Sequence, residues 1–108
     1  MNGVAVKLLL KINEKLKEVA PTNGKLLSIE RYFLLDTGEN KTLFHLINGM
    51  LETVDYREQI PDIYIFTTED ELEKILAKEV NPLESYSKGR IKIKSSFMDK
   101  LLFSELLT

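Results

Sequence analysis

The stretch EVNPLESYSKGRIKIK, residues 79–94, carries the boundary signals of a short helix followed directly by a strand. Asn81 can accept hydrogen bonds from the free N–H groups at a helix start, and Pro82 suits the first helical position because it has no N–H to satisfy. Glu84, three residues after Asn81, completes the pattern of a capping box. Gly89 is the residue type that ends helices in a left-handed conformation. The stretch therefore predicts a capped helix that stops at Gly89.

The strand that ends this stretch, RIKIK, alternates strictly between basic and aliphatic residues. Because side chains alternate between the two faces of a strand, Ile91 and Ile93 are expected to face a core. Arg90, Lys92 and Lys94 then face the other way. Two interpretations of this basic face remain open: a solvated strand face, or a contact with anionic lipid headgroups.

The composition is that of one globular domain spanning residues 1–108. Hydrophobic residues make up 44% of the chain, and a chain of this size buries roughly two-thirds of its unfolded surface. The formal net charge of −2 gives no overall field that would attract nucleic acid. The chain has no cysteine, so disulfides and thiolate chemistry are excluded.

The amino-terminal segment predicts an amphipathic helix over residues 2–20, ended by Pro21. Its apolar run is interrupted by lysines and lacks a signal-type cleavage site, so a cytoplasmic protein is expected. Lys7, Lys11 and Lys15 form a row at four-residue spacing. This row is either the solvated face of a docked helix or a contact with an anionic membrane surface.

The middle of the chain predicts four strands. Thr37-Gly38-Glu39-Asn40 has the composition of a turn, and Asn48-Gly49 between two apolar stretches is a strong hairpin signal. A loop is expected over residues 57–61. The fourth strand has apolar side chains on both of its faces, which indicates a central strand or one that is covered on both faces. The predicted strands are residues 28–36, 42–47, 50–56 and 62–67.

Two further helices are predicted after these strands. Thr68 and Glu71 form a capping-box pattern, and the acidic residues of that first turn suit the positive end of the helix dipole, so no metal site is predicted there. Ser96 and Asp99 can cap a last helix, in which seven of twelve residues are apolar. That is more than one core-facing stripe requires. This helix is therefore buried on two sides, or part of it faces a cavity, a ligand or a partner chain.

The order and motifs of these elements resemble the sterol carrier protein 2 family. Asn48-Gly49 matches the central hairpin of the family, and Thr67 with the acidic residues after it matches the step from strand to helix. The sequence departs from the family pattern at Ser85, where alanine is usual, and at Ser95 and Ser96, where glycine and then asparagine or aspartate are common. Residues 97–100 also depart from it, because they are bulkier and more charged than the usual run of small apolar residues. The other matching residues are Asn81, Pro82, Tyr86, Gly89, Arg90, Ile91, Lys92 and Ile93.

The resemblance implies an α+β fold, with a five-stranded, mainly antiparallel sheet made of a meander and a crossover strand and about four helices on one face. It also implies a non-catalytic carrier that encloses a long-chain acyl or sterol-like ligand in an apolar cavity, without a cofactor. The same residues would otherwise simply form the core. The residues expected to line the cavity are Ile12, Leu16, Leu72, Leu76, Tyr86, Ile91, Ile93, Met98, Leu101 and Leu102.

The alternative function is a protein-interaction or dimerisation module of the same fold that serves a partner enzyme through the last helix. A carrier should contain an apolar cavity of about 300 Å³ or more, whereas an interaction module should have a filled core and an exposed apolar patch. The sequence has no nucleophile, phosphate-loop or metalloprotease motif. Its only histidine, His45, lies within a predicted strand and is expected to be a sheet residue.

Overall fold

Five strands form one mixed sheet in the computed structural model, which describes residues 3–56 and 60–108. The strand order is β3-β2-β1-β4-β5, with β1 and β4 parallel and the other neighbouring pairs antiparallel. This arrangement confirms the predicted meander with a crossover strand. The strands are β1 Arg31–Asp36, β2 Lys41–Ile47, β3 Met50–Val54, β4 Ile63–Thr67 and β5 Ile91–Lys94.

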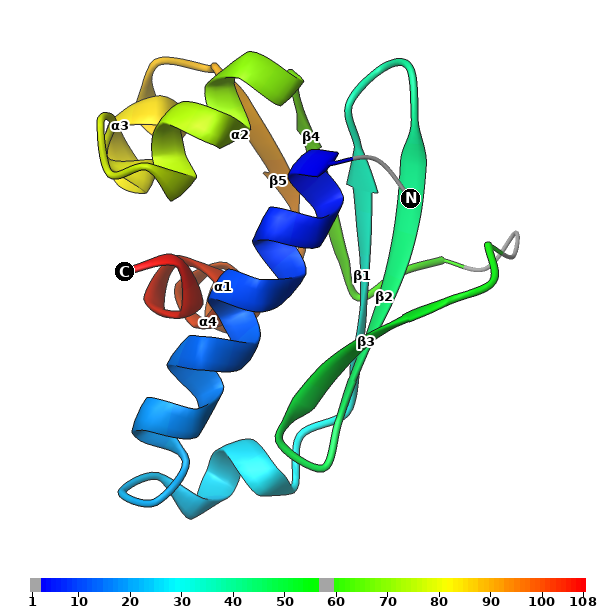
Figure 1. Ribbon diagram of the computed structural model, residues 1–108, viewed down its shortest axis with the longest axis vertical. Coiled ribbons are helices and arrows are strands. Elements are labelled where there is room, and N and C mark those ends of the chain that lie inside the picture. Colours follow the sequence, from blue (N-terminus) through cyan, green and yellow to red (C-terminus); the bar gives the residue numbers. More distant parts are fainter. Residues whose placement is uncertain (1–2, 57–59) are drawn as a thin grey trace.

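Four α-helices cover one face of this sheet (Figure 1). They are α1 Gly3–Val19, α2 Glu69–Leu76, α3 Pro82–Ser87 and α4 Phe97–Leu107, and a 3₁₀ helix, η1 Gly24–Leu27, precedes β1.

The core lies between the helices and this face of the sheet. The rings of Phe33 from β1 and Phe103 from α4 meet edge to face, with their centroids 5.9 Å apart. Leu8 of α1 and Ile63 and Ile65 of β4 are fully buried beside them. The central strand pair and the two terminal helices therefore share one hydrophobic core.

The predicted hairpin forms at Asn48-Gly49. Both residues have positive φ, 54° and 72°, as a two-residue type I′ turn requires. The turn pairs Ile47 with Met50 and thereby sets the register of β2 against β3. A Cβ on Gly49 would lie 2.6 Å from Leu27 Cδ2, so this position is also restricted by packing.

Some predicted boundaries differ from the structure. The strand expected from residue 28 begins at Arg31, because η1 is followed by a turn at Ser28 and residues 29 and 30 are not paired in the sheet. The strand expected to end at residue 56 ends at Val54. Residues 57–59 of the predicted loop lie outside the described part of the chain. Strand β4 lies between β1 and β5, which confirms its central position, but Phe66 is 40% exposed on the sheet face opposite the helices.

The helix caps are confirmed, but the two capping boxes are not completed as predicted. The side chains of Thr68 and Asn81 accept hydrogen bonds from the amides of Glu71 and Leu83. The carboxylate of Glu71 is instead bound by Ser85, and that of Glu84 is bound by Lys88 at 2.7 Å. Both glutamates therefore use their side chains away from the cap residue.

In the last helix, too, the cap forms while the acidic side chain of the first turn binds a partner outside the cap. Ser96 Oγ accepts a hydrogen bond from the amide of Asp99 at 3.2 Å, which confirms the predicted cap. The Asp99 carboxylate pairs with Arg31 Nε at 3.1 Å and so joins α4 to β1. Asp99 is therefore a tertiary contact as well as a residue of the first turn.

A buried hydrogen bond joins α2 to α3. Ser85 is fully buried, and its hydroxyl donates to Oε2 of Glu71, which is itself 8% exposed. A buried carboxylate needs such a donor, because losing its hydrogen bonds to water carries a large desolvation cost. This contact gives a physical reason for a serine at a position where the resemblance leads one to expect alanine.

On the opposite face of the sheet, Tyr64 Oη donates to Asp36 Oδ2 at 2.6 Å. Burial would raise the pKa of Asp36, but the Tyr64 hydrogen bond, the Gly38 amide and the charge of Lys41 together hold it below its ordinary value of 3.8. The same hydrogen bond, followed by desolvation, raises the pKa of Tyr64 above 10.0. The pair therefore favours the ionised Asp36 and the neutral Tyr64.

Replacing Ser85 with alanine should destabilise the fold, because it leaves the Glu71 carboxylate buried without its donor. We expect a loss of about 1–3 kcal/mol in the free energy of unfolding, measured by urea denaturation. Ser87→Ala is the matched control, since the Ser87 hydroxyl is exposed and, among the described residues, donates within α3 to the Glu84 carbonyl oxygen. Equal stability of the two variants would show that Glu71 does not depend on Ser85.

Asp36→Asn should change both the acid stability and the titration of Tyr64. Because the folded-state pKa of Asp36 is lowered, its stabilising contribution is present above about 3.8 and is lost as pH falls through the folded-state value. The stability difference between the protein and Asp36→Asn should therefore shrink in this acid range. The variant should also lower the pKa of Tyr64 in an ultraviolet absorbance titration, with Tyr64→Phe identifying the relevant component. An unchanged Tyr64 titration would contradict this coupling.

Candidate functional site

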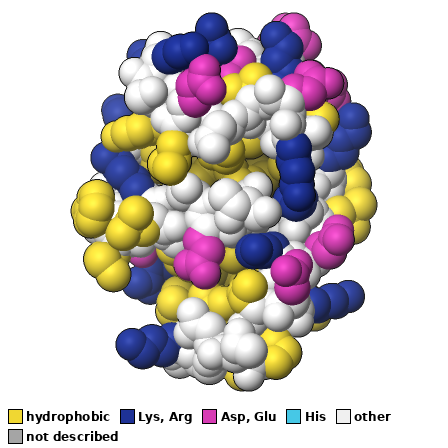
Figure 2. Space-filling model, turned by 90° about the vertical axis from the view of Figure 1, so that its left-hand side faces the viewer, with side chains coloured by type: hydrophobic (Ala, Val, Ile, Leu, Met, Phe, Trp, Pro, Cys, Tyr) yellow, Lys and Arg dark blue, Asp and Glu magenta, His cyan; other side chains and the backbone are white. Residues whose placement is uncertain are grey.

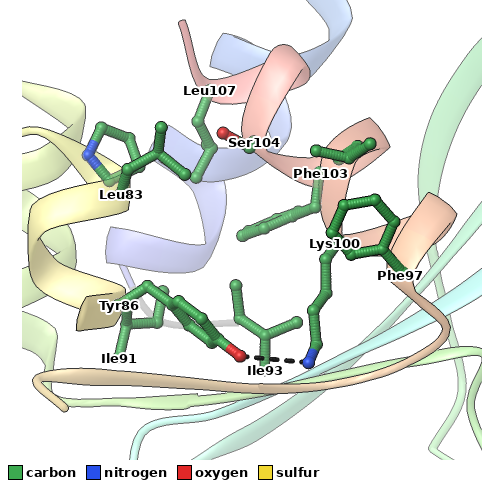
Figure 3. Close-up of a pocket in the computed structure, with 11 residues that line it drawn as sticks. Leu83, Tyr86, Ile91, Ile93, Phe97, Lys100, Phe103, Ser104 and Leu107 are labelled. Atoms are coloured by element: carbon green, nitrogen blue, oxygen red, sulfur yellow. Dashed lines mark hydrogen bonds between the residues drawn. The ribbon is translucent and has the colours of Figure 1, made fainter.

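An apolar pocket of about 180 Å³ opens between α3, β5 and α4 (Figure 3). All of its lining side chains are apolar or aromatic except those of Lys100 and Ser104. The lining residues are Pro82, Leu83, Tyr86, Ile91, Ile93, Phe97, Lys100, Leu101, Phe103, Ser104 and Leu107.

The strand side of the pocket follows from the alternation of β5. Ile91 and Ile93 pair with Thr67 and Ile65 of β4 and point to the helical side of the sheet. Gly89, with φ 74°, makes the tight reversal from α3 into this strand. The predicted inward orientation of the two isoleucines is therefore confirmed, and the three basic residues that alternate with them, Arg90, Lys92 and Lys94, are exposed.

The helical side of the pocket is formed largely by α4, whose two halves differ in burial. Phe103, Leu106 and Leu107 are buried in the core. In the first half, Phe97 and Met98 are each 71% exposed. The excess of apolar residues predicted for this helix is thus explained: one set packs in the core, and another faces the pocket and the solvent.

Further exposed apolar side chains surround the pocket. Leu83 is 61% exposed, Leu101 is 47% exposed and Tyr86 is 41% exposed, and all three line the pocket. Figure 2, which views the helical side of the molecule, shows hydrophobic side chains both within a hollow and protruding beside it. The pocket and the apolar surface around it are therefore continuous.

Two polar groups meet at one side of the pocket. Lys100 Nζ of α4 donates to Tyr86 Oη of α3 at 3.0 Å, and it lies 5.4 Å from the centre of the Tyr86 ring. Figure 3 shows this pair beside Ile93, with Ser104 near Leu107 at the other end of the pocket. The pocket thus has an apolar interior and a single charged group.

The structure brings together four of the residues predicted to line a cavity: Tyr86, Ile91, Ile93 and Leu101. The other six lie elsewhere in the structure. Ile12, Leu16 and Leu72 are fully buried in the core, Leu76 and Leu102 pack against it while partly exposed, and Met98 points to solvent outside the pocket lining.

Sequence reasoning missed the stripe Phe97, Lys100, Leu101 and Ser104, of which it named only Leu101. These residues recur at three- and four-residue steps and share one helix face. The three- and four-residue spacing could have identified this stripe. A count of apolar residues could not, because Lys100 and Ser104 belong to the stripe.

The three lysines predicted to contact a membrane surface differ in exposure. Lys7 is exposed and pairs with Glu73 of α2 at 2.9 Å, while Lys11 and Lys15 are half-buried.

Within the described residues, no group of acidic or histidine side chains is arranged to hold a metal ion. None of the helices in the same part of the chain is long and apolar enough to cross a membrane.

His45 lies in β2, as predicted. Its ring stacks on that of Tyr32, with centroids 4.3 Å apart, and Nε2 lies 2.9 Å from Oε2 of Glu30. Nδ1 lies 3.9 Å from Oε1 of Glu52. Sequence spacing did not reveal these glutamates, because strand pairing and the segment before β1 bring them to the histidine.

No model of a protein family matches the sequence, and no curated protein matches it significantly. The structure is nevertheless similar to solved structures at low sequence identity. A solution structure of sterol carrier protein 2 from Aedes aegypti, in complex with a C16 fatty acid, has a TM-score of 0.68 at 14% identity; the match covers 100% of this chain and 97% of that protein.

Two other solved structures share the architecture. UbiJ-SCP2, a ubiquinone synthesis protein, has a TM-score of 0.67 at 10% identity, with 99% of this chain and 93% of that one covered. The sec-alkylsulfatase Pisa1 from a Pseudomonas species has a TM-score of 0.63 at 16% identity over 77% of this chain, and the match spans only 14% of the sulfatase. These likenesses, together with the mixed sheet and its single helical layer, show that the chain has the sterol carrier protein 2 fold.

Proposed function

We propose that this chain is a non-catalytic, cofactor-free domain that carries an acyl lipid in the pocket between α3, β5 and α4. The observation that carries the proposal is an almost wholly apolar pocket in a chain that has the sterol carrier protein 2 fold. Each methylene that leaves water for such a surface contributes about 0.8 kcal/mol. The Aedes protein of the same fold was solved with palmitate, which supports an acyl chain as the ligand.

The pocket volume bears on how the ligand is held. At about 180 Å³ it is smaller than the roughly 300 Å³ expected of a cavity for a whole long-chain lipid. We propose that part of the chain enters the pocket and the rest lies along the exposed apolar side chains of Leu83, Phe97 and Leu101. An outward shift of the first half of α4, whose apolar side chains are exposed, would enlarge the site.

The alternative, a protein-interaction or dimerisation module, is favoured by a different observation. Met98 is 71% exposed next to Phe97 and outside the pocket lining, so a ligand confined to the pocket would leave it in water. The similar domain within Pisa1 forms a small part of a much longer chain, which supports the possibility of a domain that serves an enzyme. A second copy of this chain or a partner protein would then cover the first half of α4.

Leu101→Gln should weaken the binding of an environment-sensitive fluorescent fatty acid by about tenfold, because it places an amide against an apolar ligand without a partner. The measurement is a fluorescence titration of the delipidated protein, followed by displacement with unlabelled palmitate. Met98→Gln is the matched control, since Met98 lies on the same helix but does not line the pocket. We expect it to change affinity less than twofold.

Two results would contradict the carrier proposal. One is the absence of saturable, displaceable binding to the folded protein. The other is an equal loss of binding in Leu101→Gln and Met98→Gln. If Met98→Gln instead converts a dimer to a monomer in analytical ultracentrifugation, the result supports the alternative function of an interaction module.

We further propose that Lys7, Lys11 and Lys15 contact anionic membrane surfaces when the ligand is exchanged. Lys11→Glu combined with Lys15→Glu should then reduce sedimentation with phosphatidylserine-containing vesicles, and added salt should have the same effect on the unaltered protein. Lys25→Glu combined with Lys41→Glu is the control for net charge, because these exposed lysines lie outside the row. Equal vesicle binding by both double variants would contradict a specific role for the row.

A further inference from the structure

Lys100 is a cation without a counterion at an otherwise apolar site. Among residues 3–56 and 60–108, its ammonium makes no ion pair, and the one hydrogen bond of that ammonium is to Tyr86 Oη. The acidic residues beside it in the sequence or on α3 are engaged elsewhere, since Asp99 pairs with Arg31 and Glu84 pairs with Lys88. The protein itself therefore leaves this charge at the pocket uncompensated.

We infer that Lys100 and Tyr86 bind the carboxylate of a free fatty acid, so that the pocket selects an anionic acyl lipid over a neutral one. This inference rests on the proposed carrier function and specifies the ligand class. The ammonium of Lys100 uses one of its three N–H donors on Tyr86, which leaves two for a ligand. Because Tyr86 Oη accepts that bond, its own O–H proton remains available to a carboxylate oxygen as well.

The positions of the two groups fit one end of an amphipathic ligand. They approach each other from α4 and α3 at one side of the pocket, where both side chains keep contact with solvent (Figure 3). The buried side chain of Leu107 lines the opposite end of the pocket, and that of Phe103 lies between (Figure 3). A carboxylate beside Lys100 thus stays partly hydrated while the methylenes contact the apolar lining.

Charge also explains why a neutral headgroup would bind less well. The Lys100 ammonium donates a charge-assisted hydrogen bond to either kind of headgroup, but only a carboxylate adds the Coulomb attraction of an ion pair. Solvent access weakens this difference. We therefore expect a preference of about tenfold for an acid over the alcohol of the same chain length.

The test compares dodecanoate, dodecanol and dodecyltrimethylammonium by isothermal titration calorimetry with the delipidated full chain. These ligands share one tail and differ in head charge. Dodecanoate should bind about tenfold more tightly than dodecanol, and the cation more weakly than either. Lys100→Met should remove the preference for dodecanoate while changing dodecanol binding less than twofold, and Lys100→Arg should retain it.

Lys92→Met is the matched control, because it removes the same charge from the exposed face of β5, away from the pocket. It should leave all three affinities within twofold. Tyr86→Phe should lower the affinity for dodecanoate about threefold and leave dodecanol unchanged, since the ring remains and only one hydrogen bond is lost. Circular dichroism and thermal unfolding establish that each variant is folded.

The possible outcomes separate this inference from the proposed function. Equal affinities of the unaltered protein for dodecanoate and dodecanol would overturn the carboxylate site and leave the carrier standing. Failure of all three ligands to bind would overturn both. A Lys100→Met variant that weakens the binding of dodecanol and dodecanoate equally would show that Lys100 does not discriminate between the two headgroups, which also overturns the inference.

Discussion

The pairing of β5 with β4 is the constraint on which the rest of the site depends. Ile93 stands opposite Ile65, and Ile91 stands opposite Thr67, whose hydroxyl also donates to the carbonyl of Arg90 at 3.0 Å. This register turns both isoleucines of β5 toward the helices. A shift by one residue would send them to the solvent and turn the lysines inward, because strand side chains alternate. Helices α3 and α4 flank β5 in the chain, so the same pairing brings them together around the pocket.

Within the helical layer, some segments are packed firmly in the core and others are largely exposed. Helix α1 and the second half of α4 bury large side chains in the core, and Arg31 with Asp99 joins the start of α4 to β1. The apolar side chains in the first half of α4 remain largely exposed. Segments with few buried contacts open at lower free-energy cost than the core does. A movement of the first half of α4 would have to open the Arg31–Asp99 pair, but it would leave the strand pairings of the sheet intact.

Local signals in the sequence predicted most of the fold. Asn48-Gly49 specified its turn because only a few residue types accept positive φ at two successive positions, and the alternation of β5 specified which face is buried. Predictions failed where a side chain found a partner far along the chain. Glu71 has the spacing of a capping-box residue, yet its carboxylate is bound by Ser85 of another helix. The predicted ligand contacts are a separate matter: Ile12 and Leu72 have the apolar character expected of a cavity wall, and the structure buries both within the core. Apolar pattern alone cannot distinguish the two environments.

The parallel pairing of β1 with β4 has a consequence for the order in which the molecule folds. The meander of β1, β2 and β3 joins strands that are neighbours in sequence, whereas β4 reaches β1 only after the whole meander has been passed, with Phe33 opposite Ile63. Long-range pairings of this kind form more slowly, because a longer loop must close before any contact is gained. Strand β5 adds to β4, and α3 and α4 assemble around β5. We therefore expect newly synthesised chains to form the pocket late in folding, after the strands of the meander have paired.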